Sequence, residues 1–317
     1  MSEAPRRNCC VCGSGAVAAR HRTREMMFGL REPFDYTECG GCGSLQISDV
    51  PADLARHYPS GYYSLRPAVV PRGLRGAIRR IRNGYALTGR GLLGRALHAV
   101  FPYPVRGAHR WVRRMGLDRS ARILDVGCGA GDLLKDLGQA GFRHLLGADP
   151  FVTTDLDLGD GVSVLKRTLE EVEGEFDLVM FHHALEHTAS PAAVLRAAAA
   201  RLRPGGWCLV RVPTVTGEAW ERYGPDWVQL DPPRHLFVPS ARGMETLAER
   251  TGFHLEAIEY DSTELQFVGS ELYRRDIPLN DANGQFSRAQ LRRFRRNARR
   301  LNRAARGDQA AFYLRRC

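Results

Sequence analysis

The sequence predicts an α/β fold built on a Rossmann-like sheet, and three features lead to this prediction. An apolar, strand-like run at residues 123–126 passes through a glycine-rich turn into a helix-like run at residues 132–137. A second strand-like run, residues 145–148, ends in Asp149 and Pro150. A third begins at Phe176 and leads through a polar turn into an alanine-rich helix. Alternating strands and helices are typical of a mostly parallel sheet covered by helices.

The glycine-rich turn, residues 124–131, reads LDVGCGAG and indicates a nucleotide-binding corner. Glycines let the backbone approach a ligand closely, and the start of the following helix offers free N–H groups. The spacing G-x-G-x-G is one residue tighter than that of dinucleotide sites. Asp149 stands about 20 residues beyond the turn, where an acidic side chain accepts hydrogen bonds from a ribose diol. The alternative is that Asp149 only forms a turn before Pro150.

The remaining strands are expected in chain order. Residues 176–181 form a buried strand, and Ser190 (N-cap) and Pro191 (first turn) open a helix that reaches Leu202. The RPGG segment, residues 203–206, ends that helix, and residues 207–212 form the next strand. Ser240 caps a further helix, residues 253–260 form strand six, and strand seven is expected to end near Tyr273.

The order of these motifs resembles that of class I S-adenosylmethionine (SAM) methyltransferases. Residues 124–131 match motif I of that family, and Leu185-Glu186-His187 with the later Pro204-Gly205-Gly206 match its pattern around strands four and five. The resemblance covers roughly residues 115–273 and implies a seven-stranded methyltransferase sheet with SAM as cofactor. The cofactor contacts that it implies are Asp125, Gly127, Cys128, Gly129, Gly131, Asp149, Pro150, Leu169 and His182.

Two cysteine pairs near the N-terminus predict a small metal-binding module. Cys9-x-x-Cys12 and Cys39-x-x-Cys42 can each wrap a metal, and together they complete a four-sulfur tetrahedral site. A hairpin at residues 17–36 can fill the gap between the pairs. We expect structural Zn²⁺, because four sulfur ligands leave no open position for water. Cys10 is a competing ligand, and four unrelated reduced cysteines are the alternative.

With this module, the chain resembles bacterial methyltransferases of polysaccharide and deoxysugar pathways. The sugar C-methyltransferases of that group also carry a four-cysteine N-terminal module, but this sequence lacks their long C-terminal domain. We therefore divide the chain into a zinc-binding module (1–58), basic amphipathic helices (59–114), a SAM-binding domain (115–275) and a basic helical extension (276–317).

Composition and charge limit the alternatives. The chain has 317 residues, 44% of them hydrophobic, and a formal net charge of +11. No apolar run approaches the ~20 residues of a membrane span, and the first residues lack a signal-peptide pattern, so a cytoplasmic protein is expected. Arginines alternate with apolar residues in 60–90, in 91–106 and after Ser287. For 60–90 we favour a helix packed on the core with a solvated basic face.

For 91–106, attachment to a surface and a role as a lid over the substrate are equally favoured. The segment after Ser287 has a stripe of Leu291, Phe294, Ala298 and Leu301 among its arginines. It can bind anionic lipid, nucleic acid or an acidic partner, or form a solvated helix that packs by this stripe. Peripheral contact with the inner membrane face therefore remains an alternative to a purely soluble state.

Acceptor chemistry is expected at the C-terminal ends of strands four and five. His235, in the segment DPPRHLF, is the candidate general base, and the sugar C-methyltransferases carry a reactive histidine in a similar position. The alternative is a structural histidine that binds the loop backbone. His183 is expected near the acceptor, whereas Glu186 and His187 are taken as structural. Residues expected to contact substrate are Trp220, Tyr223, Trp227 and Arg234, with pairing to Asp231 as an alternative for Arg234.

The leading hypothesis is a SAM-dependent methyltransferase of a sugar, glycan or other small biosynthetic intermediate, acting at oxygen. C-methylation of a nucleotide-linked sugar is an alternative. A second is an RNA methyltransferase that uses the basic surface and the zinc module, although nucleic acid is the less favoured partner because no N/D-P-P-[YF] motif follows strand four. A third is a binding protein that keeps the fold without methyl transfer.

Overall fold

The protein is described from a computed structural model. The structure describes residues 8–58, 73–89, 91–101 and 108–317. Features expected in 59–72 and 102–107, including Tyr62 and Tyr63, lie outside these described residues.

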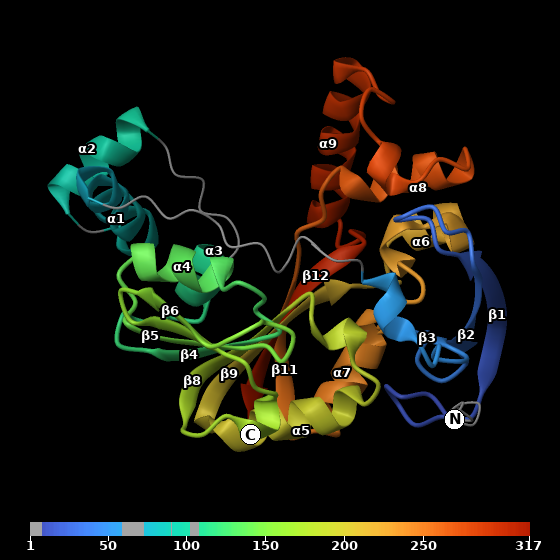
Figure 1. The fold of residues 1–317 in the computed structure, drawn as a ribbon, viewed down its shortest axis with the longest axis horizontal. Coiled ribbons are helices and arrows are strands. Elements are labelled where there is room, and N and C mark those ends of the chain that lie inside the picture. Colours follow the sequence, from blue (N-terminus) through green and yellow to red (C-terminus); the bar gives the residue numbers. More distant parts are fainter. Residues whose placement is uncertain (1–7, 59–72, 90, 102–107) are drawn as a thin grey trace.

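The core of the molecule is an eight-stranded mixed sheet, which confirms the predicted α/β class (Figure 1). Its order is β11-β12-β9-β8-β4-β5-β7-β6, and every neighbouring pair from β9 to β7 is parallel. Antiparallel β12 lies between β9 and β11, and β6 adds an antiparallel edge strand that the sequence did not predict. The bounds are β4 (Arg122–Val126), β5 (His144–Ala148), β6 (Leu156–Gly159), β7 (Val162–Leu165), β8 (Phe176–His182), β9 (Leu202–Pro213), β11 (Phe253–Tyr260) and β12 (Gln309–Arg316).

Helices cover both faces of this sheet (Figure 1). On one face α3 (Ala108–Arg114) and α4 (Asp132–Gln139) bury Trp111, Leu134 and Leu137 against the strands. On the other face lie α5 (Pro191–Arg201) and α7 (Ala241–Glu249). Ser240 caps α7 as predicted, since its hydroxyl accepts a 2.8 Å hydrogen bond from the Gly243 amide.

The prediction of strand seven near residues 261–273 is wrong. These residues contain α8 (Leu265–Arg274). Its buried residues recur at intervals of three and four, which is helical rather than alternating spacing: Gln266, Phe267, Gly269, Ser270, Leu272 and Tyr273. The last strand of the sheet is β12, which the sequence analysis had placed in the C-terminal extension. Its residues 310–314 are buried on both faces, which is the pattern of an interior strand.

Between α8 and β12 stands α9 (Arg288–Arg303), which begins at Ser287 as predicted. Ser287 and Gln290 form a capping box. The predicted apolar stripe packs on the body of the protein: Leu301 and Ala298 are buried, and Phe294 stacks on Phe267. A 3-10 turn (Leu279–Asp281) precedes this helix.

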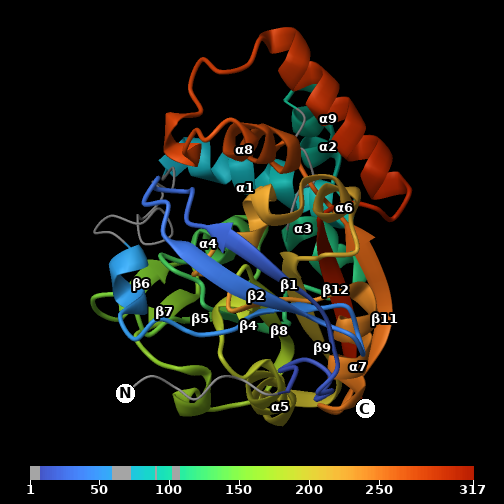
Figure 2. The same cartoon turned by 90° about the vertical axis from the view of Figure 1, so that its right-hand side faces the viewer.

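The N-terminal module is a four-stranded antiparallel sheet, β1-β2-β3-β10 (Figure 2). The predicted hairpin is formed by β1 (Val17–Arg24) and β2 (Pro33–Cys39), which pair along their length. Next comes β3 (Leu45–Ile47), and the fourth strand, β10 (Phe237–Val238), comes from the loop that follows β9. The module is therefore joined by backbone hydrogen bonds to the loop that carries His235.

A helical hairpin, α1 (Gly73–Thr88) and α2 (Leu92–Val100), packs beside α3 and α4. The expectation that its apolar residues face the core is wrong for α1, where Leu74, Ile78 and Ile81 are exposed. Within the described part of the chain, no helix combines the length and hydrophobicity that crossing a membrane requires. The remaining helix, α6 (Glu218–Tyr223), lies between β9 and β10.

Candidate functional site

The glycine turn between β4 and α4 has the shape of a ligand cradle. Gly127, Gly129 and Gly131 all adopt positive φ angles, of 71°, 53° and 76°, which favour glycine. A Cβ atom on Gly127 would lie 2.6 Å from the Cβ atom of Ala184, and one on Gly131 would lie 2.8 Å from Val164 Cγ2. The turn is thus closed to larger side chains and lies directly against the loop after β8.

Asp149 is held at the end of β5 next to this turn. One carboxylate oxygen accepts a 2.8 Å hydrogen bond from the Gly129 amide, and the other accepts a 2.9 Å hydrogen bond from the Phe151 amide. Each oxygen retains a further lone pair for a ligand. Pro150 and Phe151 are exposed beside it, so the edge of the cradle has an apolar surface.

Asp125, in β4, has a buried carboxyl group. Its Oδ1 atom has no hydrogen-bond partner within the described residues. Burial, and secondarily the charge of Asp149, raises the pKa of Asp125 to about 8. A cationic ligand in the cradle would satisfy this oxygen and favour the ionised form. Because SAM carries a sulfonium and an ammonium group, the residues present fit the expected cofactor.

Three further predicted cofactor contacts surround the cradle. The Cys128 sulfur packs against Gly147, where a Cβ atom would lie 2.4 Å away. Leu169 is buried at the start of a 3-10 turn (Leu169–Glu171) after β7. His182 ends β8, where its ring lies 5.4 Å from that of Trp111, and burial keeps the pKa of His182 well below its usual range.

The loop after β8 holds a chain of charged and polar groups. His183 has a positive φ of 53°. Its Nε2 atom accepts a 2.5 Å hydrogen bond from Arg211, so its Nδ1–H donates to Glu186 at 3.1 Å. Arg211 also donates to Asp261 at 2.6 Å. Sequence reasoning missed Arg211 and Asp261, because neither lies in a recognisable motif.

His235 and His187 meet beside Glu186. Each ring uses its Nδ1–H to donate to a backbone carbonyl: His235 to Gln229 at 2.8 Å and His187 to Arg234 at 2.9 Å. In the neutral form, both Nε2 atoms are therefore hydrogen-bond acceptors. The rings lie 4.9 Å apart, and Glu186, in a 3-10 turn (Leu185–His187), is fully buried.

This arrangement brings several hydrogen-bond acceptors close together, with the Tyr58 hydroxyl 3.2 Å from His187 Nδ1. His235 Nε2 lies 4.0 Å from Glu186 Oε1, and Glu186 Oε2 has no partner within the described residues. Burial, then the charge of His187, lowers the pKa of His235 to about 4. Although burial opposes ionisation of Glu186, the hydrogen bond from His183 and the nearby imidazoles hold its pKa at about 2.

The three residues could hold either a hydroxyl group or a metal ion. One ligand atom from each of Glu186, His187 and His235 lies within 4.8 Å of the others. Glu186 and His187, expected to be structural, therefore belong to the same cluster as His235.

Arg234 has the second of its two expected roles, since it pairs with Asp231. It is fully buried and donates to Asp231 at 2.9 Å, to Glu25 at 2.9 Å and to the His57 carbonyl at 3.2 Å. The guanidinium has no free face for a substrate phosphate. Glu25, in the N-terminal module, was missed by sequence reasoning because its partner lies 209 residues away.

The aromatic residues after β9 differ in exposure. Trp227 is fully buried and donates from Nε1 to Asp308 at 2.9 Å. Tyr223 is buried and donates to Glu271 at 2.8 Å. Trp220 is half-buried and makes edge contacts with His21 and Trp227. In this conformation Trp220 alone among these three presents ring surface that an acceptor can reach.

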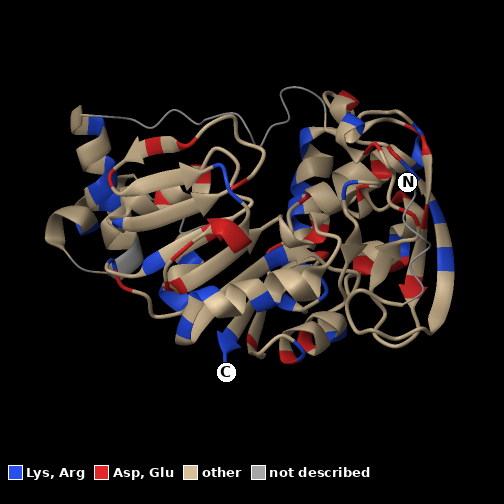
Figure 3. Ribbon diagram, turned by 60° about the horizontal axis from the view of Figure 1, so that its bottom comes forward, with Lys and Arg blue, Asp and Glu red and all other residues tan. Residues whose placement is uncertain are grey.

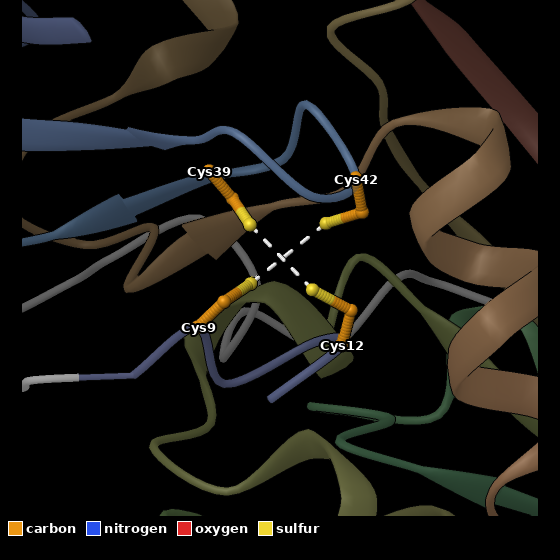
Figure 4. A group of neighbouring side chains, drawn as sticks. All are labelled: Cys9, Cys12, Cys39 and Cys42. Atoms are coloured by element: carbon orange, nitrogen blue, oxygen red, sulfur yellow. Dashed lines mark hydrogen bonds between the residues drawn. The ribbon is translucent and has the colours of Figure 1, made fainter. Parts of the chain in front are cut away.

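The four predicted cysteine ligands converge on one point (Figure 4). Cys9 and Cys42 sulfurs lie 3.8 Å apart, and those of Cys12 and Cys39 lie 3.5 Å apart. The two knuckles have matching turns, in which the amides of Gly13 and Gly43 each donate at 2.8 Å to the first cysteine of the pair. Cys10 instead donates its amide to Gln46 and is not part of the cluster.

Comparison with known proteins decides the class. A family model described as a methyltransferase domain matches residues 98–258, about half of the chain. The chain belongs to this methyltransferase family. It is a SAM-dependent methyltransferase.

Curated relatives of this methyltransferase include ubiquinone biosynthesis O-methyltransferases. The protein from Bordetella avium (strain 197N) is 34% identical over 131 residues, which cover 35% of this chain and 49% of the relative. That from Pseudomonas aeruginosa (strain UCBPP-PA14) is 35% identical over 121 residues, covering 35% and 50%. The methyltransferase thus spans about half the length of these relatives. A solved SAM-dependent methyltransferase from Mesorhizobium loti matches with 20% identity and a TM-score of 0.41, covering 67% of this chain and 100% of that one.

Proposed function

We propose that the methyltransferase transfers the SAM methyl group to a hydroxyl oxygen of a sugar, glycan or other small biosynthetic intermediate, as in polysaccharide biosynthesis. The observation that carries the proposal is the cluster of Glu186, His187 and His235, in which one ligand atom of each lies within 4.8 Å of the others and Glu186 Oε2 has no hydrogen-bond partner within the described residues. A hydroxyl group supplies the missing hydrogen. The relatives are named as O-methyltransferases, which supports an oxygen atom as the methyl acceptor.

The roles of the residues follow from their contacts. When bound, SAM supplies an electrophilic methyl group. His235, neutral at pH 7 because its pKa is about 4, accepts the proton of the acceptor hydroxyl. Glu186 stabilises the imidazolium that forms, and His183 holds Glu186 in place with a 3.1 Å hydrogen bond. Ala184, packed on Gly127, keeps this loop beside the cofactor turn.

The acceptor is proposed to enter past Trp220, whose ring is half-buried. Stacking of a sugar ring on an indole is a common mode of glycan binding because the ring faces are apolar. Tyr223 and Trp227 are proposed to support Trp220 from behind, since Trp227 contacts its edge.

We also propose that the four cysteines bind structural Zn²⁺. With Zn–S bonds of about 2.3 Å, tetrahedral coordination places sulfurs about 3.8 Å apart. The paired distances of 3.8 and 3.5 Å fit this geometry. Ser240 donates from its hydroxyl to the Cys42 carbonyl at 2.5 Å, so the metal would stabilise the start of α7 and the loop before it.

The test is to incubate the protein with methyl-labelled SAM and a lysate of its source, and then to fractionate the products. A Gly129→Arg variant serves as the matched inactive control. Label in glycan or glycolipid that acid hydrolysis releases as an O-methyl sugar, or in another O-methylated small molecule, supports the proposal. Ribonuclease-sensitive label would establish the RNA alternative instead, and a carbon-bound methyl group would establish C-methylation.

A further inference from the structure

The α1–α2 hairpin carries its large apolar side chains on the outside. In α1, small or polar residues face the protein: Gly76, Asn83, Gly84 and Ala86 are buried. Leu74, Ile78 and Ile81, spaced four and three residues apart, lie on the opposite face and are exposed. An ordinary surface helix buries its large residues.

The second helix continues this exposed surface. Gly94 lets the two helices cross closely, because a Cβ atom there would lie 2.6 Å from Tyr85 Cβ. We define the hairpin apolar face as the large hydrophobic side chains of α1 and α2, with Phe101, that are between 41% and 85% exposed: Leu74, Ile78, Ile81, Leu92, Leu93, Val100 and Phe101. Exposed large hydrophobic side chains gathered on one helical hairpin are typical of an interaction surface.

The charged side chains of the hairpin itself are all basic. Residues 73–101 contain no aspartate or glutamate (Figure 3). Arg75, Arg79 and Arg95 are exposed beside the apolar side chains. The basic helix α9 rises on the same side of the molecule as the hairpin, as the upper part of Figure 1 shows. Its outward arginines are Arg292, Arg293, Arg296, Arg299 and Arg303.

We propose that the hairpin apolar face docks into the surface of an anionic lipid bilayer, with α9 as a second, electrostatic contact. Apolar side chains flanked by arginines match the boundary between acyl chains and acidic headgroups. A second copy of the chain fits this face less well. It would place Arg75, Arg79 and Arg95 of one copy near those of the other, without acidic partners. The helices lie on the surface rather than crossing it, in keeping with their 16 and 9 residues.

This inference does not depend on which acceptor is methylated. Most of the hairpin lies outside the region that matches the family model, because that region begins at residue 98. The hairpin contacts α4 at its C-terminal end, where a Cβ atom on Gly84 would lie 3.8 Å from the Ala140 carbonyl oxygen, so it lies at the other end of α4 from the glycine turn. Docking would hold the enzyme at the membrane, where a lipid-linked acceptor is found, whereas a water-soluble acceptor would not require this surface.

The experiment is co-sedimentation of the full chain with vesicles of phosphatidylcholine alone or mixed equally with phosphatidylglycerol. We expect binding to the anionic vesicles that weakens with salt. A triple variant, Ile78→Gln, Leu92→Gln and Phe101→Gln, should lower the bound fraction at least tenfold. The matched control exchanges three exposed apolar residues elsewhere, Val17, Leu30 and Leu265, for glutamine and should bind like the wild type.

SAM affinity, measured on every variant, reports folding independently of lipid. If the hairpin variant sediments like the wild type, or if the wild type ignores anionic vesicles, the proposal is overturned. It is also overturned if light scattering shows a dimer that the hairpin variant, but not the control, converts to monomers. An Arg292→Gln, Arg293→Gln, Arg296→Gln variant should weaken binding to anionic vesicles without affecting the cofactor, and full retention of binding would remove α9 from the contact.

Discussion

The hydroxyl group of Tyr36, in the N-terminal module, donates a 2.6 Å hydrogen bond to the backbone carbonyl of His235. Two other contacts hold the same segment: the Leu236 amide donates to the Glu186 carbonyl at 2.8 Å, and β10 pairs with β3. The buried ion pair between Arg234 and Glu25 adds a fourth. The cysteine module therefore forms one wall of the proposed acceptor site rather than a separate appendage.

Replacing Tyr36 by phenylalanine should lower acceptor turnover, with a modest effect on the free energy of unfolding and none on SAM affinity. The change leaves a buried carbonyl without its donor, which costs about 1–3 kcal/mol. We expect kcat for the acceptor to fall roughly tenfold as His235 loses its alignment, with SAM affinity unchanged in calorimetry. Tyr313→Phe, which removes a buried hydroxyl bound to Glu259 on β11, is the matched control. Equal turnover in the two variants would show that Tyr36 only supports the fold.

Substitution of His235 by alanine should reduce turnover by roughly 10²-fold or more, the usual contribution of a general base. SAM affinity should be retained, because His235 lies outside the glycine cradle. His254→Ala, an exposed histidine on β11, is the control. Because the pKa of His235 is about 4, the base form is already present at neutral pH. At saturating SAM, the wild-type rate should therefore not fall as pH drops through about 6.5, the usual histidine pKa, and should fall only nearer pH 4.

A wild-type rate in the alanine variant would make His235 a structural residue that only binds the Gln229 carbonyl. The wild-type rate could instead fall with an apparent pKa near the usual histidine value, and this fall could be absent in the variant. That result would keep His235 as the base but contradict its lowered pKa.

Much of the fold could be predicted because its signals are local. The glycine turn, the capping residues Ser240 and Ser287, and each C-x-x-C pair are recognised within a few residues of their own position. The misplaced last strand shows the limit of this reasoning. Residues 261–273 and 309–316 both mix apolar with polar residues, and it is pairing with β9 and β11 that makes the second segment the strand.

The candidate site was predicted in part for the same reason. His235 and His183 stood out by residue type and place in the chain. Arg211, Asp261 and Glu25 act through partners 28 to 209 residues away, which no local pattern encodes. The sequence also did not predict that Trp227 and Arg234 are buried. Each of them satisfies its polar atoms with a carboxylate distant in the sequence rather than with solvent.

Loss of one cysteine ligand should remove the metal and weaken the acceptor site. We expect wild-type protein to contain about one equivalent of zinc, and Cys12→Ser to lose it and melt at a lower temperature, because metal binding contributes directly to folding. Acceptor turnover should also fall, since β3 and the Cys42 turn support the loop before α7. Cys10→Ser is the matched control, because Cys10 lies outside the cluster. Metal content by mass spectrometry decides, and full zinc occupancy in Cys12→Ser would disprove the four-sulfur site.

Gly129→Arg should abolish SAM binding while leaving the fold intact. Gly129 has a φ of 53° and is buried in the cradle, so an arginine there would strain the backbone and fill the ligand space. The same change should not alter zinc content, because the cysteine cluster is on another sheet. Calorimetric titration with SAM gives the measurement, and thermal melting without ligand serves as the fold control. Unchanged affinity would refute the cofactor assignment of this turn.

Cofactor affinity should increase with pH through the ionisation of Asp125. In the free protein its pKa is about 8, so the carboxyl group is mostly protonated at neutral pH. A cation beside it favours the carboxylate, so binding must release a proton below about pH 8. The association constant should then rise with pH, by at most about tenfold per pH unit, and level off above about pH 8. Asp125→Asn cannot ionise and should bind more weakly with a flat profile. Calorimetry in two buffers of different ionisation enthalpy measures the released proton directly, and a wild-type titration with no proton release at pH 7 would show that Asp125 is already ionised or does not face the cation.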